Sequence, residues 1–141
     1  MTRTLKLPFL FGVALLAATV SATGLEAQAA TAHSKEDFTQ ERFAQLQAEG
    51  AFILVDIFAD WCPDCAIQQR VLTEYREQHP DVPLHTLVVN FDTQKDIVTQ
   101  FRAPRQSTLI LFRGTEQLWF SVAETRAEVL VQALNEGYAG R

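Results

Sequence analysis

Residues 51–65 read AFILVDIFADWCPDC, a nearly continuous apolar run that ends in two cysteines three positions apart. β-Branched and aromatic residues dominate residues 51–59, which is typical of a strand buried on both faces of a sheet. The apolar spacing then becomes helical from Cys62 to Gln78, and Pro80 cannot continue a helix. We therefore predict a buried strand that runs straight into a helix, with an inward helix face made of Ile67, Val71, Leu72 and Tyr75.

Helices and strands alternate along the rest of the chain. Thr39 is a candidate cap for a helix that ends at Gly50, with an apolar face of Phe43, Leu46 and Ala44. The sequence further predicts strands at 35–38, 84–91, 108–112 and 117–121, a hairpin turn at 113–116 and a short helix at 93–101. Residues 125–128 (TRAE) fit a capping box for a final helix that uses Val129, Leu130, Ala133 and Leu134 and ends before Gly137.

This order of elements decides the fold class. Strands that are separated by helices are joined by right-handed parallel crossovers, whereas the late hairpin adds antiparallel strands at one edge. We predict an α/β domain with one mixed central sheet and helices on both faces.

Length and charge exclude several classes of protein. The chain has 141 residues, so one domain is expected. Its net charge of −5 and its pI near 5.1 argue against nucleic-acid binding, which requires a basic surface. No apolar run approaches the roughly 20 residues that span a bilayer, so no ordinary membrane-spanning helix is predicted.

The first 29 residues are typical of a secretory signal peptide. Arg3 and Lys6 precede an apolar run at 7–20, and small residues follow it up to Ala-Gln-Ala at 27–29. We expect cleavage after Ala29 or at a neighbouring alanine, an exported, periplasmic location, and a folded domain over residues 30–141. An uncleaved amino-terminal anchor is the alternative, although the apolar run is short for a bilayer.

The two cysteines are placed for thiol chemistry. A Cys-x-x-Cys pair at the start of a helix lies within disulfide reach, and the N–H groups of the first turn stabilise a thiolate. Pro63 suits that turn because it has no N–H to leave unpaired. We therefore expect Cys62, at an exposed helix tip, to be the nucleophile. Cys65, one turn further in, is expected to resolve mixed disulfides formed by Cys62.

Two other uses of the cysteine pair stay open. A purely structural disulfide is possible in an exported protein, but closing so short a loop removes little entropy from the unfolded chain. A metal site would need ligands besides Cys62 and Cys65. The histidines of the sequence are His33, His79 and His85, and none lies at ligand spacing from another.

The stretch from Phe52 to Cys65 resembles the active-site strand and helix of thioredoxins. Ser107 to Gly114 (STLILFRG) resembles the strand that follows the cis-proline loop of that family. The specific part of the resemblance is the Asp-x5-Cys-x-x-Cys spacing with a tryptophan before the first cysteine, and the whole resemblance covers roughly Phe38 to Gly137. It implies a thioredoxin-like fold, thiol–disulfide exchange with protein or small-thiol partners, and no bound organic cofactor.

The resemblance also implies roles for other side chains. Asp56 matches the family's aspartate, which moves a proton to or from the resolving thiol, and burial should raise its pKa. The alternative is a strand-end carboxylate that reaches water. Trp61 matches the tryptophan that frames the substrate groove, with simple packing as its alternative role. Ser107 and Thr108 fall where the family binds its substrates.

Three positions depart from the family's pattern. Pro63-Asp64 replaces the usual Gly-Pro between the cysteines, Val88 stands where the family has a lysine behind the active site, and Ser107 stands in place of the cis-proline. A cis bond before a residue other than proline costs about 2.5–4 kcal/mol, so we expect a trans bond before Ser107. We also expect Ser107→Pro to keep or improve exchange, and to weaken an incidental affinity of the reduced cysteines for Cu(I) or Zn(II).

Asp64 and Asp60 decide the expected direction of exchange. Both carboxylates are close to Cys62 in sequence and disfavour a thiolate there, which makes the dithiol a better electron donor, although the helix dipole opposes them. We predict a monomeric reductant of protein disulfides that is supplied by a membrane electron donor. A metal-binding or metallochaperone module built on Cys62 and Cys65 is the alternative function.

Overall fold

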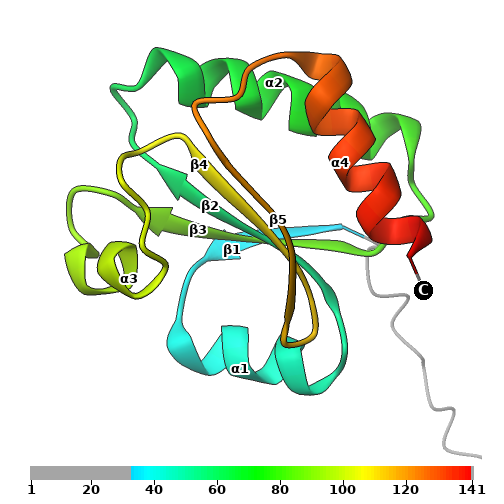
Figure 1. Ribbon diagram of the computed structural model, residues 1–141, viewed down its shortest axis with the longest axis horizontal. Helices are drawn as coiled ribbons and strands as arrows, with labels where there is room; N and C mark the ends of the chain where they lie inside the picture. The colour runs from blue at the N-terminus through cyan, green and yellow to red at the C-terminus, as the bar shows by residue number, and fades with distance from the viewer. Residues whose placement is uncertain (1–32, 141) are drawn as a thin grey trace, which may run out of the picture.

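The computed structural model describes residues 33–140, which form a five-stranded mixed sheet between two layers of helices (Figure 1). The strands are β1 (Ser34–Asp37), β2 (Phe52–Phe58), β3 (Leu84–Asn90), β4 (Thr108–Arg113) and β5 (Glu116–Val122). The helices are α1 (Gln40–Ala48), α2 (Pro63–Gln78), α3 (Lys95–Gln100) and α4 (Ala127–Ala139). The predicted signal peptide lies outside the described residues.

The predicted mixed sheet is confirmed. Its strand order is β1-β3-β2-β4-β5, in which β1 and β2 both run parallel to β3. β4 is antiparallel to β2 and β5 is antiparallel to β4, as the predicted hairpin requires. β2 is therefore central, and Asp56 pairs in register with Val88 of β3 on one side and Leu109 of β4 on the other.

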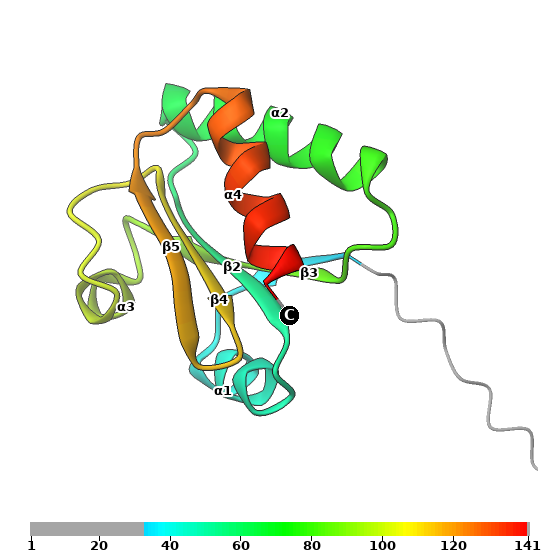
Figure 2. The ribbon, with the colours of Figure 1, turned by 45° about the vertical axis from the view of Figure 1, so that its right-hand side comes forward.

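Alternate residues of β2 face different helices. Ile53, Val55 and Ile57 belong to the apolar cluster that includes residues of α1 and α3, whereas Phe52 and Leu54 pack with residues of α2 and α4. The same alternation turns Asp56 toward α2. Figures 1 and 2 show α2 and α4 together on one face of the sheet, with α1 and α3 on the other. No helix within residues 33–140 is long and apolar enough to cross a membrane.

Two helix details differ from the sequence prediction. Ala44 of α1 is exposed, while Phe43 and Leu46 are buried as expected. The capping box expected at residues 125–128 is absent, because α4 begins after Arg126 without a side-chain cap. Instead, Glu124 Oε1 accepts the N–H groups of Thr125 (3.0 Å) and Arg126 (2.9 Å).

Gly137 lies inside α4 rather than beyond its end, which is a second correction to this helix. A Cβ atom at Gly137 would come within 2.6 Å of Leu111 Cδ2 and 3.2 Å of Phe52 Cε2. Glycine is therefore needed for the close approach of α4 to the sheet and does not terminate the helix, which continues to Ala139.

Candidate active site

Cys62 occupies the N-cap position of α2, at the end of the turn that follows β2. Its N–H donates to the Ala59 carbonyl (3.1 Å), and its Sγ accepts the N–H of Cys65 (3.2 Å). Pro63 is the first helical residue, as predicted. The Cys62 sulfur therefore lies where the N–H groups and the dipole of the helix stabilise negative charge.

Both cysteines are buried, which corrects the prediction of an exposed nucleophile. Cys62 is 2% exposed and Cys65 is 0% exposed. They cluster with Ala59, and Phe58 and Phe91 pack against this cluster. The hydrogen bond from Cys62 back to Ala59 closes the turn, so the exposed position at the helix tip is taken by Trp61, whose exposed fraction is 59%.

Cys65 differs from Cys62 in its surroundings. Burial, followed by the hydrogen bond with Cys62, raises the pKa of Cys65 to about 11, and the charge of Asp56 contributes in the same direction. Cys65 is therefore a neutral thiol near pH 7. It needs a base before it can attack a disulfide, because the thiolate is the reactive form.

Asp56 is buried in the layer between β2 and α2. Its exposed fraction is 0%, and burial raises its pKa to about 6 against the opposing effects of a Gln69 hydrogen bond and the charges of Lys35 and Arg76. Burial and a raised pKa were expected, and both are confirmed; the alternative of a water-reaching carboxylate is wrong. Gln69 Nε2 donates to Asp56 Oδ2 (2.6 Å), while Oδ1 is buried and has no hydrogen-bond partner among residues 33–140.

Trp61 is held by one hydrogen bond at the surface. Its Nε1–H donates to Asp92 Oδ2 (2.8 Å), in the turn that follows β3. With 59% of the residue exposed, simple packing does not account for this side chain. The exposed indole therefore presents an apolar surface next to Cys62, and the hydrogen bond to Asp92 orients it.

The chain is similar to known proteins over most of the described residues. The Thioredoxin family model matches residues 31–136. The chain belongs to the thioredoxin family. It is 30% identical over 98 residues to a thioredoxin of Chlamydia trachomatis, an alignment that covers 70% of this chain and 93% of that protein. It is also 34% identical over 76 residues to a thioredoxin of Alicyclobacillus acidocaldarius, covering 54% and 71% of the two chains.

The crystal structure of Trxlp from Edwardsiella tarda is a further match. It is 44% identical, has a TM-score of 0.68, and the alignment covers 72% of this chain and 98% of that one. The predicted thioredoxin-like fold is confirmed. Family membership and the Cys62–Cys65 pair show that this member of the family is a thiol–disulfide oxidoreductase, a class that acts on protein disulfides.

Ser107, at the cysteine end of β2, has a backbone conformation that residues other than glycine seldom adopt. The bond before Ser107 is trans and its φ is 62°. Its N–H donates to the Ile57 carbonyl (2.8 Å), and its own carbonyl accepts the N–H of Ala123 (2.8 Å). Proline has no N–H and cannot adopt a positive φ. Proline does not fit this backbone conformation, so the effect of Ser107→Pro on exchange and on metal affinity stays a prediction that depends on whether the loop can rearrange.

Arg105 connects the Ser107 loop to α2. Its Nη2 lies 3.3 Å from Asp64 Oδ2, and its carbonyl accepts the Thr108 hydroxyl (2.7 Å). Thr108 is buried, so its side chain supports the loop and is not presented to a client protein. The Arg105–Asp64 pair is exposed and therefore weak, but it partly offsets the charge of Asp64, and the sequence alone did not indicate this pairing.

Two glutamines of α2 complete the site, and sequence reasoning missed both. Gln68 is fully buried, and its Nε2 donates to the carbonyls of Ser107 (3.2 Å) and Glu124 (2.9 Å). Gln69 holds Asp56. A signal was available, because these polar residues lie next to Ile67 on a helix that must cover a strand containing a buried carboxylate.

The described residues offer the cysteines no further metal ligand. Within residues 33–140, no group of three or more His, Cys, Asp and Glu side chains is arranged to hold an ion. His79 follows the last residue of α2, so a helix of 16 residues, about 24 Å long, separates it from Cys62. His33 bonds to the His79 carbonyl, and His85 to Ser34, at that same distant end.

Proposed function

We propose that this thioredoxin-family enzyme reduces protein disulfides in the cell envelope, with Cys62 as the attacking thiol and Cys65 as the resolving thiol. The asymmetry of the pair carries the assignment of roles. The Cys62 sulfur lies at the N-terminus of α2, whereas Cys65 is buried and its pKa is raised to about 11. A thiol of that kind reacts only with the help of a base, and Asp56 is the buried carboxylate whose charge acts on it.

Reduction of a client then takes two exchange steps. The Cys62 thiolate attacks the client disulfide, forms the Cys62–client S–S bond and releases one client thiolate. Asp56 next takes the proton of Cys65, and the Cys65 thiolate attacks Cys62 Sγ. The Cys62–Cys65 bond forms and the second client thiolate leaves, taking a proton from Asp56 or water. Two electrons pass from the dithiol to the client.

The charges near Cys62 support the reducing direction. Asp64 stands between the cysteines and Asp60 precedes them, and negative charge disfavours a thiolate and so favours the oxidised enzyme. Arg105 weakens the contribution of Asp64 without removing it, because the pair is exposed. The oxidised enzyme would be returned to the dithiol by an electron donor in the membrane.

The envelope location rests on the sequence of residues 1–29, which has the charge, apolar length and Ala-Gln-Ala end of a signal peptide. We expect the chain to be cut after Ala29 and to act as a monomer outside the cytoplasm. Oxidised cysteine pairs of envelope proteins are then its clients.

A trapping experiment tests roles and location together. The full chain, with Cys65→Ser, is produced in a Gram-negative bacterium, and periplasmic and cytoplasmic fractions are separated without reducing agent. Mixed disulfides with envelope proteins should accumulate in the periplasm. Mass spectrometry should show that the trapped chain begins at Ala30. The Cys62→Ser chain should trap none. Trapping by Cys62→Ser alone would reverse the roles, and an uncut chain in the cytoplasm would refute export.

A further inference from the structure

A short chain of hydrogen bonds joins the buried Asp56 to the edge of the sheet. Gln69 Nε2 donates to Asp56 Oδ2 (2.6 Å), and Lys35 Nζ of β1 donates to Gln69 Oε1 (2.6 Å). An ammonium only donates and a carboxylate only accepts, so the direction of the Gln69 amide is fixed. One amide therefore links an exposed cation to a fully buried carboxylate.

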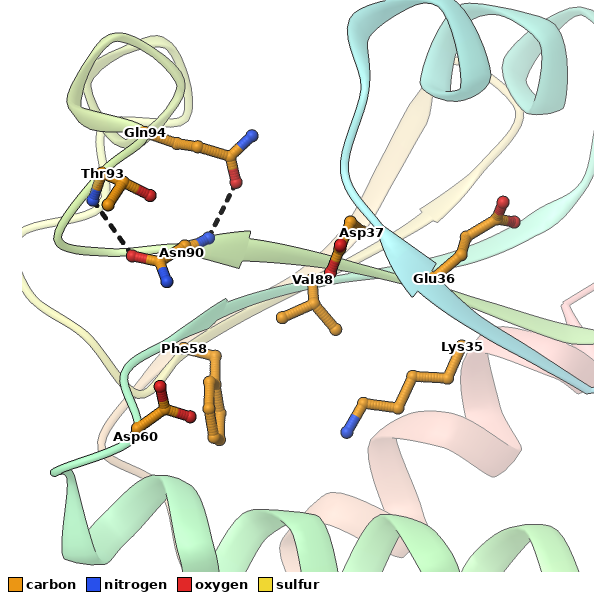
Figure 3. Close-up of a pocket in the computed structure, with 9 residues that line it drawn as sticks. All are labelled: Lys35, Glu36, Asp37, Phe58, Asp60, Val88, Asn90, Thr93 and Gln94. Atoms are coloured by element: carbon orange, nitrogen blue, oxygen red, sulfur yellow. Dashed lines mark hydrogen bonds between the residues drawn. The ribbon is translucent and has the colours of Figure 1, made fainter.

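Lys35, the exposed end of this series of hydrogen bonds, lies at an open pocket of about 640 Å³ (Figure 3). Figure 3 shows the Lys35 side chain extending toward α2, on the same side of the sheet as Phe58 and Val88. Val88 on β3 is the register partner of Asp56, and Phe58 lies two residues after Asp56 on the same face of β2. The pocket thus brings solvent to the residues that border Asp56 and to the lysine that is linked to it.

Few charged groups face Asp56. Arg76 of α2 is the second cation; its Nη2 donates to Thr86 Oγ1 (2.6 Å) and its charge lowers the pKa of Asp56, as that of Lys35 does. Cys65 is the other titratable group that interacts with Asp56, because the charge of Asp56 raises the pKa of Cys65. The register partners on β3 and β4, Val88 and Leu109, carry no charge.

We propose that Gln69 and Lys35 are positioning residues for proton transfer at Asp56. Gln69 holds Oδ2, so that the buried and unpartnered Oδ1 is the oxygen that takes the Cys65 proton; one S–H bond breaks and one O–H bond forms. Lys35 on β1 supplies positive charge that acts on Asp56, whose neighbour on β3, Val88, is apolar. The inference rests on the proposed role of Asp56 as the base.

The pKa of Asp56 is the direct test. It is measured in the reduced, mature chain from the pH dependence of the side-chain carboxyl ¹³C resonance. Gln69→Leu removes the hydrogen bond together with the link to Lys35, and Lys35→Met removes the charge, so both should raise the pKa of Asp56, Gln69→Leu by more. Lys35→Arg should restore it. Lys35 Nζ lies over the Phe58 ring (5.9 Å to the centroid), and Lys95 Nζ lies in the same way over the Phe91 ring (3.7 Å) but outside this network, so Lys95→Met is the matched control.

A kinetic measurement adds a second readout. Cys62 is loaded with 5-thio-2-nitrobenzoate, and the release of that chromophore by Cys65 is followed against pH. Lys35→Met and Gln69→Leu should slow release severalfold near pH 6, and the rate should recover at higher pH. If these variants had a lower melting temperature but an unchanged pKa of Asp56 and an unchanged pH dependence of release below pH 7, the positioning role alone would be overturned. An Asp56→Asn chain that releases the chromophore at the wild-type rate would overturn the base role as well.

Discussion

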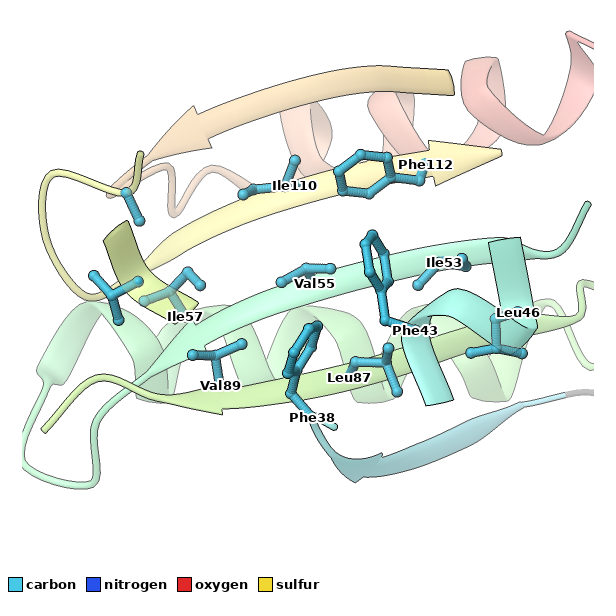
Figure 4. Close-up of a cluster of buried hydrophobic side chains, with 12 residues drawn as sticks. Phe38, Phe43, Leu46, Ile53, Val55, Ile57, Leu87, Val89, Ile110 and Phe112 are labelled. Atoms are coloured by element: carbon cyan, nitrogen blue, oxygen red, sulfur yellow. The ribbon is translucent and has the colours of Figure 1, made fainter. Parts of the chain in front are cut away.

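On the face of the sheet covered by α1 and α3, the buried cluster is apolar and rich in phenylalanine (Figure 4). Phe43 lies 5.3–5.6 Å, between ring centroids, from Phe38, Phe101 and Phe112. On the face covered by α2 and α4, the buried residues include Asp56, Gln68 and Thr86. Asp56 and Ile57 are neighbours in β2, both 0% exposed, yet they face these two different layers. Burial of apolar groups stabilises the fold, whereas burial of a carboxylate costs stability and creates a base that titrates near neutral pH.

The largest expected effect is the loss of an aromatic ring from the apolar layer. Phe43→Ala should lower the free energy of unfolding by about 3–5 kcal/mol, because it removes ring contacts and leaves a cavity. Urea denaturation measures it. Phe120→Ala on β5, where the side chain is 38% exposed, is the control and should change stability little. Equal losses at the two positions would show that the apolar layer is not the main source of stability.

Ser107, at the active-site end of the sheet, provides the next test. Ser107→Pro should destabilise the fold by about 3 kcal/mol or more, because it removes the hydrogen bond to Ile57 and cannot match a φ of 62°. Ser107→Gly keeps the N–H and suits a positive φ, so its stability should stay within about 1 kcal/mol of wild type. A proline variant as stable as wild type would show that this loop readily adopts another backbone conformation.

Asp56→Asn tests the cost of the polar layer. The pKa of Asp56 is about 6 in the fold against 3.8 for an ordinary aspartate, so the folded state binds the proton more tightly. Wild-type stability should therefore fall as pH rises from about 4 to about 6, by up to about 3 kcal/mol.

Because asparagine does not titrate, Asp56→Asn should be more stable than wild type at pH 7, and this advantage should shrink toward pH 4. The same substitution at the exposed Asp81 is the control and should leave the pH dependence unchanged. An Asp56→Asn protein that loses stability at pH 7 would mean that the buried carboxylate stabilises the fold.

The smallest expected effect concerns Asp64. Asp64→His replaces a negative charge between the cysteines, and should raise the reduction potential by about 20 mV. The Arg105 pair reduces this effect, so Arg105→Gln should make the wild-type couple slightly more reducing. Equilibration with glutathione buffers measures both. A potential that falls in Asp64→His would contradict the proposed influence of this carboxylate.

Patterns local in sequence predicted most of the fold. The apolar run at 51–59, the helical spacing after Cys62 and the RGTE turn each depend on neighbouring residues, and β2, α2 and the β4–β5 hairpin lie where these patterns placed them. The capping box failed for a reason outside its four residues, since Glu124 already satisfies the first N–H groups. Gly137 was misread because its contact is with Leu111, far away in sequence.

The candidate site was predicted only in part. The burial of Asp56 followed from its apolar strand, but the burial of Cys62 depends on how one turn folds against Phe58 and Phe91. Lys35, Gln69 and Arg105 reach the site from β1, from α2 and from a loop. For Lys35 and Arg105, neither residue type nor spacing differs from that of ordinary surface side chains, whereas the position of Gln69 on the helix face that covers Asp56 was a usable signal.

The equilibrium reduction potential of the Cys62–Cys65 couple tests the central claim most directly. The mature chain is equilibrated with defined ratios of reduced and oxidised glutathione, and the two forms are separated after alkylation. A reductant should have a potential below the roughly −180 mV of protein disulfide isomerase, toward the roughly −270 mV of thioredoxin. A value near the roughly −120 mV of strongly oxidising enzymes would contradict the proposed direction of electron flow.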